Sequence, residues 1–183
     1  MVRRVGIFCG ANTGNGSRYA DVAASAARCI AAQGFGIVYG GGCVGLMGVV
    51  ADAALEAGGE VIGVIPQALA TKELAHGGLT RLHVVSSMHE RKALMADLSD
   101  AFVALPGGYG TMDEFCEILT WAQLHIHAKP VGLLNDGGYY DELLALFDKM
   151  VREGFVTPVN RGLVQSAAEI HELLDIMLAG MQA

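Results

Sequence analysis

The sequence predicts an α/β protein: a doubly wound parallel sheet with helices on both faces, in a single domain over residues 1–183. Short, nearly continuous apolar runs alternate with longer segments of helical periodicity, and no linker, repeat or low-complexity stretch divides them. Apolar runs without polar alternation are typical of parallel strands that are buried on both faces. A chain of 183 residues can bury roughly 70% of its unfolded surface without disulfides or metals.

Each predicted element follows from its own pattern. Six strands are expected at the apolar runs, namely Val5–Cys9, Gly36–Tyr39, Glu60–Ile65, Leu82–Val85, Ala101–Leu105 and Val131–Leu134. Helices are expected between and after them, the last two on apolar residues that recur at spacings of three and four. They are Ser17–Gln33, Leu46–Ala57, His89–Leu98, Thr111–His125, Tyr139–Arg152 and Ala168–Leu178.

Composition excludes several classes of protein. The net charge of −7 argues against nucleic-acid binding and against binding to anionic membranes. No apolar run is long enough to span a membrane, and the stretch before Gly10 is too short for a signal peptide, so we expect a cytoplasmic protein. The high hydrophobic content, 52% with little aromatic contribution, also suggests an apolar face for a subunit partner.

The four cysteines are Cys9, Cys29, Cys43 and Cys116, and none forms a CxxC pair. His125 and His127 are two residues apart, a spacing that puts them on different faces of a helix. We therefore expect buried, reduced thiols and no metal site.

Three glycine-rich loops follow predicted strands: Gly10–Gly16, Gly40–Gly48 and Pro106–Gly110. Because parallel strands end at the same edge of a sheet, these loops should lie together and form a ligand site. Glu73, in the connection after the third strand, and Arg91, at the start of the helix after the fourth, could face the same edge.

The loop Pro106–Gly110 is expected to lead into a helix whose first turn carries Thr111, Asp113 and Glu114. Glycines allow a ligand to approach the backbone closely, and the free N–H groups of a helix N-terminus favour an anion such as phosphate. A carboxylate beside such a cradle repels the phosphate. Glu114 therefore indicates catalysis rather than binding.

Residues 40–45 read G-x-G-x-x-G, which raises the possibility of a dinucleotide site. However, the motif follows the second predicted strand, and the next strand ends in Pro66 and Gln67 without the acidic residue that holds the ribose. A nucleotide-lining loop and a plain tight turn remain the better interpretations. No Lys precedes Thr111, so the phosphate-binding loop of ATPases is not present.

Arg91 and Lys92 are adjacent cations near a predicted helix N-terminus, where they oppose the helix dipole. A solvated first turn would explain them, but the neighbouring cradle favours a role with an anion. Glu117 lies one turn after Glu114 and is interpreted as structural, holding a cation in place.

Three motifs together resemble the Lonely Guy (LOG) family: residues 106–114 fit its PGGxGTxxE signature, and residues 87–92 and 39–48 fit two further segments. The resemblance extends from residues 5–10 through 121–124 to 129–135. It implies a Rossmann-like homodimer that cleaves the N-glycosidic bond of cytokinin riboside 5′-monophosphates, and often of AMP, without a cofactor or a metal. Members are often labelled lysine decarboxylases, a reaction that needs pyridoxal phosphate and its supporting groups.

The resemblance also assigns site residues. Arg91 and Glu114 match the catalytic pair of the family. Substrate-binding positions, including neighbours in the two glycine loops, are Gly41, Gly42, Glu73, Lys92, Gly107, Gly108, Tyr109, Gly110, Thr111 and Thr120. The alternatives are a non-catalytic nucleotide-binding protein of the same fold and an NAD-dependent enzyme; a DNA-binding relative is disfavoured because no basic surface is expected.

Overall fold

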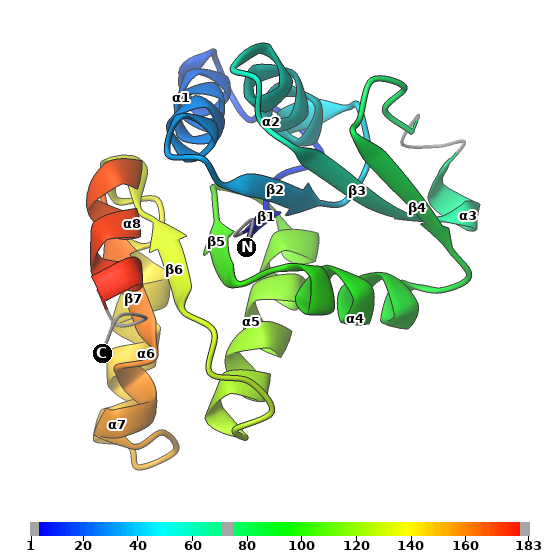
Figure 1. Ribbon diagram of the computed structural model, residues 1–183. Coiled ribbons are helices and arrows are strands. Elements are labelled where there is room, and N and C mark those ends of the chain that lie inside the picture. The colour runs from blue at the N-terminus through cyan, green and yellow to red at the C-terminus, as the bar shows by residue number, and fades with distance from the viewer. Residues whose placement is uncertain (1–3, 71–74, 180–183) are drawn as a thin grey trace.

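The computed structural model describes residues 4–70 and 75–179, in which strands and helices alternate along the chain (Figure 1). The strands are β1 (Arg4–Phe8), β2 (Gly36–Tyr39), β3 (Val61–Pro66), β4 (Arg81–Val85), β5 (Ala101–Ala104), β6 (Val131–Leu134) and β7 (Val164–Ala167). The helices are α1 (Arg18–Ala32), α2 (Gly45–Glu56), α3 (Gln67–Ala70), α4 (Met88–Leu98), α5 (Tyr109–Gln123), α6 (Asp141–Arg152), α7 (Pro158–Arg161) and α8 (Ile170–Ala179), with a 3₁₀ turn η1 (Asp136–Gly138).

All strands pair in parallel in one sheet, in the order β4-β3-β2-β1-β5-β6-β7. Strand β1 lies in the middle of the sheet. Strands β2, β3 and β4 follow outward on one side of it, and the chain then returns to place β5 on the other side of β1. Phe8 at the end of β1 lies in register with Ala104 at the end of β5. At such a reversal the loops after the two strands leave on opposite faces, which opens a crevice at their carboxyl ends. The predicted doubly wound parallel sheet is confirmed.

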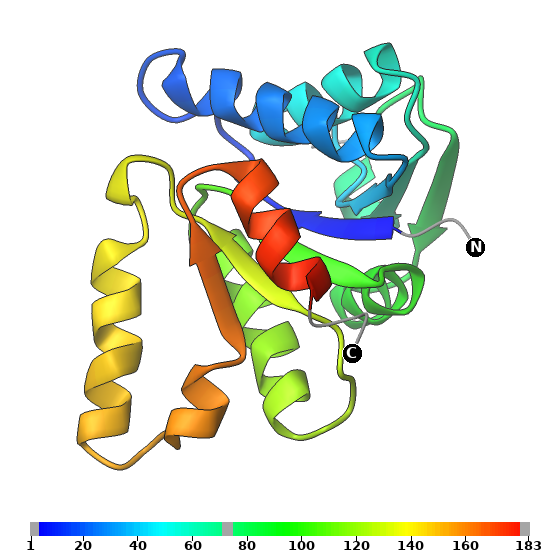
Figure 2. The same ribbon diagram turned by 60° about the vertical axis from the view of Figure 1, so that its left-hand side comes forward.

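Helices cover both faces of the sheet (Figure 2), and the buried side chains form two hydrophobic layers, one on each face. Alternate residues of β1 point to opposite faces, so Val5 and Ile7 pack in one layer and Phe8 in the other. The first layer holds α1, α2 and α8; the second holds α4, α5 and α6. Small side chains dominate the α1 and α2 contribution, which explains the high apolar content with few aromatics; they are Ala23, Ala26, Ala27, Ala51, Ala53 and Ala54.

The seventh strand, β7, is not among the strands predicted from the sequence. Its sequence is Val-Gln-Ser-Ala, and it forms an edge of the sheet on β6. An edge strand is partly solvated and needs no continuous apolar run, so the expected pattern is missing. The short helices α3 and α7 were missed for a similar reason, because four residues are too few for a helical period.

One expectation about the cysteines is wrong. Cys9 is buried and Cys29 half-buried, but Cys43 and Cys116 are exposed. Cys43 lies just before α2 and Cys116 on the surface of α5, and the spacing of the cysteines, on which the expectation rested, says nothing about the exposure of either position. Within residues 4–70 and 75–179, no cluster of three potential metal ligands occurs. The helices of this part of the chain all lack the combined length and apolar character that crossing a bilayer requires.

Candidate active site

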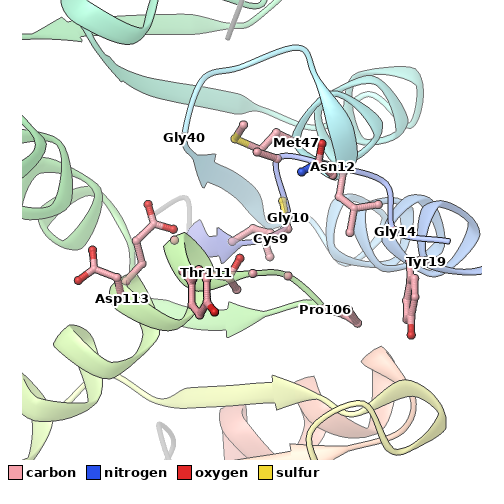
Figure 3. A pocket seen from close by; sticks show the side chains of 18 of the residues that line it. Cys9, Gly10, Asn12, Gly14, Tyr19, Gly40, Met47, Pro106, Thr111 and Asp113 are labelled. Carbon is pink, nitrogen blue, oxygen red and sulfur yellow. The ribbon is translucent and has the colours of Figure 1, made fainter. Parts of the chain in front are cut away.

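A cavity of about 510 Å³ opens at the carboxyl ends of β1, β2 and β5. Its walls come from all three glycine-rich loops, through residues 10–14, residue 40 and residues 106–111 (Figure 3). The start of α4 adds Arg91, and α5 adds Glu114. The prediction that the three loops meet at one edge of the sheet is therefore confirmed, and the volume suits a small-molecule ligand.

The loop after β5 ends in the N-terminus of α5, which begins at Tyr109 with Gly108 as its N-cap. No side chain caps this end of the helix, so its first N–H groups are left for a ligand. The expected start at Thr111 was two residues late, because glycine and tyrosine gave no helical signal. Consequently Glu114 lies in the second turn of the helix, one turn from the anion cradle. This offset reduces the repulsion between its carboxylate and a bound phosphate.

Thr111 faces the cradle from the first turn of α5. Its side chain is buried, and its hydroxyl oxygen has no hydrogen-bond partner among the described residues. A buried hydroxyl without a partner is costly unless a ligand or water completes it. Gly107 leaves the necessary space, because a Cβ atom there would overlap the Thr111 hydroxyl and lie 2.9 Å from the backbone nitrogen of Gly10.

Arg91 and Glu114 face each other inside the cavity. One guanidinium nitrogen of Arg91 lies 3.9 Å from Oε1 of Glu114 and donates a hydrogen bond of 3.2 Å to the carbonyl oxygen of Gly40. Both side chains are largely buried, with exposed fractions of 7% for Arg91 and 12% for Glu114. The Nε–H of Arg91 has no hydrogen-bond partner among the described residues. The predicted catalytic pair is thus brought together, with one donor left for a ligand.

Cys9 lies on the floor of the same cavity, at the end of β1. Burial raises the pKa of its thiol well above the usual range, and the charge of Glu114 adds to this, while that of Arg91 opposes it. The thiol is therefore protonated at neutral pH, and it contributes a neutral surface rather than a nucleophile.

Lys92 does not line the cavity in this structure. Its ammonium group lies 3.2 Å from a carboxylate oxygen of Asp113 and 3.1 Å from one of Glu117, so it bridges α4 and α5. Burial alone would lower the pKa of Lys92, but the hydrogen bonds to Glu117 and Asp113 outweigh it and raise the pKa. The interpretation of Glu117 as a structural partner for a cation is confirmed, and the cation is Lys92.

Three other predicted site residues, Gly41, Gly42 and Thr120, are not among the residues that line the cavity. The carbonyl oxygen of Gly41 accepts a hydrogen bond from the backbone N–H of His76, and that of Gly42 one from the Tyr39 hydroxyl. Thr120 lines a smaller hollow of about 190 Å³, away from the cavity, and donates to the carbonyl oxygen of Cys116. Glu73 lies outside the described residues.

Several lining residues were not singled out from the sequence, among them Cys9, Asn12, Tyr19, Met47, Leu69 and Tyr139. The loop Gly10–Gly16 was recognised, which could have led to Asn12. Tyr139 follows β6 and reaches the cavity only because that strand lies beside β5. Nothing in the local sequence indicates this contact.

Solved structures with a similar fold include molybdenum cofactor carrier and binding proteins. A molybdenum cofactor carrier protein from Chlamydomonas reinhardtii aligns with a TM-score of 0.75 and 24% identity, over 98% of this chain and 99% of that one. A molybdenum cofactor binding protein from Rippkaea orientalis aligns with a TM-score of 0.74 and 21% identity, over 99% and 98%. At these identities the likeness shows the fold alone.

Sequence comparisons are more specific. Residues 47–177 match the family model described as "Possible lysine decarboxylase". A rice protein named "Probable cytokinin riboside 5'-monophosphate phosphoribohydrolase LOGL1" is 53% identical over 174 residues, which are 95% of this chain and 78% of that protein. The cytokinin riboside 5′-monophosphate phosphoribohydrolase of Rhodococcoides fascians is 53% identical over 163 residues, or 88% and 82%. LOG3 of Arabidopsis thaliana, which has the same name, is 48% identical over 172 residues, or 94% and 80%.

The residues matched by the family model include the loop at residues 106–111 and helices α4 and α5, which line the cavity, and the match to the rice protein covers 95% of this chain, so the comparisons concern the site as well as the fold. The chain belongs to the LOG family, whose curated members are named cytokinin riboside 5′-monophosphate phosphoribohydrolases.

Proposed function

We propose that the protein hydrolyses the N-glycosidic bond of cytokinin riboside 5′-monophosphates, and of AMP, to release the free base and ribose 5-phosphate. The observation that carries this proposal is one cavity that holds both an uncapped helix N-terminus and a buried Arg91–Glu114 pair. The names of relatives that are about half identical to this chain support the same reaction.

The reaction breaks the bond between C1′ of the ribose and the purine nitrogen. The bonding electrons leave with the purine, and C1′ becomes cationic, as in other glycoside cleavages. Water then adds its oxygen to C1′. One of its protons stays on the new C1′ hydroxyl, and the other is released and replaced by the proton that the departing purine nitrogen takes up. Glu114 is suited to stabilise the cationic ribosyl centre or to accept a proton from this water.

Arg91 acts in a different way. A guanidinium stays protonated at neutral pH and cannot serve as a proton donor, so its role is electrostatic. It stabilises the negative charge that develops on the departing purine, or holds the substrate beside Glu114. Its contact with the Gly40 carbonyl oxygen restrains it near the carboxylate.

The 5′-phosphate provides binding energy remote from the bond that breaks. The backbone N–H groups of Gly107, Gly108, Tyr109 and Gly110 form its cradle, and the unpartnered hydroxyl of Thr111 completes it. This contact positions C1′ against Glu114, since phosphate and carboxylate sites lie one helical turn apart.

Other assignments from the family resemblance stay proposals. Glu73 would bind a ribose hydroxyl or the base. Lys92 would act by holding Asp113 at the cavity wall, and Gly41 and Gly42 by shaping the loop behind Gly40. Thr120 is peripheral and would affect the substrate only indirectly. We further propose that the protein is a cytoplasmic homodimer with no nucleic-acid or membrane partner.

The family description does not make this protein a lysine decarboxylase. Pyridoxal chemistry requires a lysine that forms the aldimine with the cofactor. No lysine of the described residues lines the cavity, and Lys92, the nearest in sequence to the site, is engaged by two carboxylates. An NAD-dependent reaction is likewise disfavoured, because the glycine motif follows β2 rather than the first strand.

Chromatography after incubation with isopentenyladenosine 5′-monophosphate or AMP tests the proposal. Release of free base together with an equal amount of ribose 5-phosphate is expected. A protein that binds AMP and never releases adenine would instead be a nucleotide carrier, and a change in NADH fluorescence on mixing would favour the dinucleotide alternative.

A further inference from the structure

Two adjacent tyrosines before α6 hold the backbone of the phosphate-binding loop. The hydroxyl of Tyr140 donates a hydrogen bond of 2.6 Å to the carbonyl oxygen of Leu105, and that of Tyr139 one of 2.6 Å to the carbonyl oxygen of Gly107. The carbonyl oxygen between them, on Pro106, accepts from the backbone N–H of Gly10 at 3.3 Å. Three consecutive carbonyl groups of the loop are therefore held by donors from elsewhere in the chain.

The direction of each carbonyl fixes the direction of the next N–H group. In a trans peptide the C=O and the following N–H point to opposite sides, and this chain contains no cis peptide bond among the described residues. Holding the carbonyl of Pro106 thus orients the N–H of Gly107, and holding that of Gly107 orients the N–H of Gly108. These are the first two amides of the proposed cradle.

The peptide between Gly107 and Gly108 is the one most able to turn. Glycine on both sides removes the steric barrier that Cβ atoms would impose on rotation. A rotated peptide would present its carbonyl oxygen where a phosphate oxygen is expected, and would repel it. Only the hydroxyl of Tyr139 holds this carbonyl among the contacts of the described residues.

The tyrosines are themselves fixed from the end of β6. The side-chain oxygen of Asn135 accepts a 2.6 Å hydrogen bond from the backbone N–H of Tyr140, and its amide nitrogen donates to Asp141 at 2.8 Å. The rings of Tyr139 and Tyr140 meet edge to face with centroids 4.9 Å apart. Burial raises the pKa of the Tyr140 phenol, so it remains a hydrogen-bond donor.

We propose that Tyr139 and Tyr140 are positioning residues, which keep the amides of Gly107 and Gly108 directed at the 5′-phosphate. Neither hydroxyl needs to touch the substrate for this role. The inference rests on the proposed function, because it assigns these amides to a nucleotide phosphate.

The variant Tyr139→Phe tests the proposal by removing only the hydroxyl. For isopentenyladenosine 5′-monophosphate we expect kcat/KM to fall about fivefold to tenfold, mainly through KM, which is the effect of one lost hydrogen bond. For the nucleoside without its phosphate, kcat/KM should not change. The ratio of the two values is the diagnostic readout, since a general loss of folded protein lowers both equally.

Three further variants separate the hydroxyl from the ring and from stability. Tyr140→Phe should shift the ratio in the same direction, which keeps the proposal testable if one variant folds poorly. Tyr139→Leu also removes the ring contacts, and should add little beyond Tyr139→Phe. Thr157→Ala removes a side-chain hydrogen bond on α7, far from the cavity, and should leave the ratio unchanged.

Calorimetric binding of ribose 5-phosphate gives a readout that does not depend on turnover. Tyr139→Phe should weaken this binding about fivefold to tenfold. An unchanged ratio and unchanged binding in Tyr139→Phe would overturn the positioning role. If the wild-type protein binds ribose 5-phosphate but releases no base from any nucleotide, the proposed function fails while the binding comparison still decides the role of the tyrosines.

Discussion

The guanidinium of Arg91 lies 3.9 Å from the carboxylate of Glu114 and is tied to the loop after β2 by its hydrogen bond to the Gly40 carbonyl oxygen. Three parts of the chain that are distant in sequence meet at this point: the loop at residue 40, helix α4 and helix α5. Arg91 therefore links Glu114 to the glycine loop at residue 40. This link leads to predictions about each partner.

Glu114→Gln keeps the size and hydrogen-bonding capacity of the side chain but removes its charge. We expect kcat for base release to fall at least about a hundredfold, the usual range for a lost acid–base group. Circular dichroism and thermal unfolding should match the wild-type protein. Near-normal turnover in this variant would remove Glu114 from the mechanism.

Gly40→Ala should disable the site by displacing Arg91, although no catalytic residue is itself substituted. A Cβ atom at this position would overlap the terminal nitrogen of Arg91 and lie 3.1 Å from the sulfur of Met47. Because the terminal nitrogen is the flexible end of a long side chain, Arg91 should move while the backbone stays. We expect kcat/KM to fall on the order of a hundredfold, as for other small misplacements of catalytic groups, and Tm to change by at most about 4 °C.

Gly77→Ala is the matched control for that substitution, since a Cβ there meets no atom within 4 Å. It should retain wild-type kcat/KM. Loss of fold in Gly40→Ala, or full activity with Arg91 displaced, would contradict the argument.

The phosphate cradle predicts strong discrimination between nucleotide and nucleoside. Isopentenyladenosine should be a poorer substrate than its 5′-monophosphate by at least about a hundredfold in kcat/KM, because the remote binding energy of the phosphate is lost. Initial rates of base release from the two compounds, measured over a range of concentrations, give this ratio. Equal values would refute the assignment of residues 107–111 as the phosphate site.

His127 predicts a pH dependence of stability outside the site. Its Nδ1 accepts a hydrogen bond from the backbone N–H of Lys129, and its other ring nitrogen donates to the carbonyl oxygen of Ile118, so the folded ring is neutral. Burial lowers its pKa and the charge of Lys129 adds to this, although the Ile118 hydrogen bond opposes them. Below the ordinary histidine pKa of about 6.5 the unfolded chain therefore binds a proton that the folded chain does not.

The free energy of unfolding should consequently decrease as the pH falls through about 6.5. Thermal unfolding of wild type and His127→Gln at neutral and mildly acidic pH checks this sign. The variant should lose less stability on acidification than the wild type, with His89→Gln at an exposed position as the control for the substitution itself. An identical loss in wild type and His127→Gln would show that this ring does not contribute.

The sequence was sufficient to predict the sheet, its parallel direction and the meeting of three loops at one edge, because buried parallel strands need continuous apolar runs and glycine loops need no tertiary information to be recognised. It was also sufficient to select Arg91, Thr111 and Glu114, which the cavity brings together. It was insufficient for β7, whose position at the edge relaxes the demand for apolar residues.

Only the tertiary structure decided where the cations and tyrosines act. Arg91 and Lys92 are neighbours in the sequence, yet one turns into the cavity toward Glu114 and the other away from it toward Asp113 and Glu117. Tyr139 reaches Gly107 because β6 is placed beside β5, a pairing between segments that no local pattern specifies. Periodicity determines which residues are buried within an element, whereas contacts between elements depend on how the sheet orders its strands, and this order sets the geometry of the site.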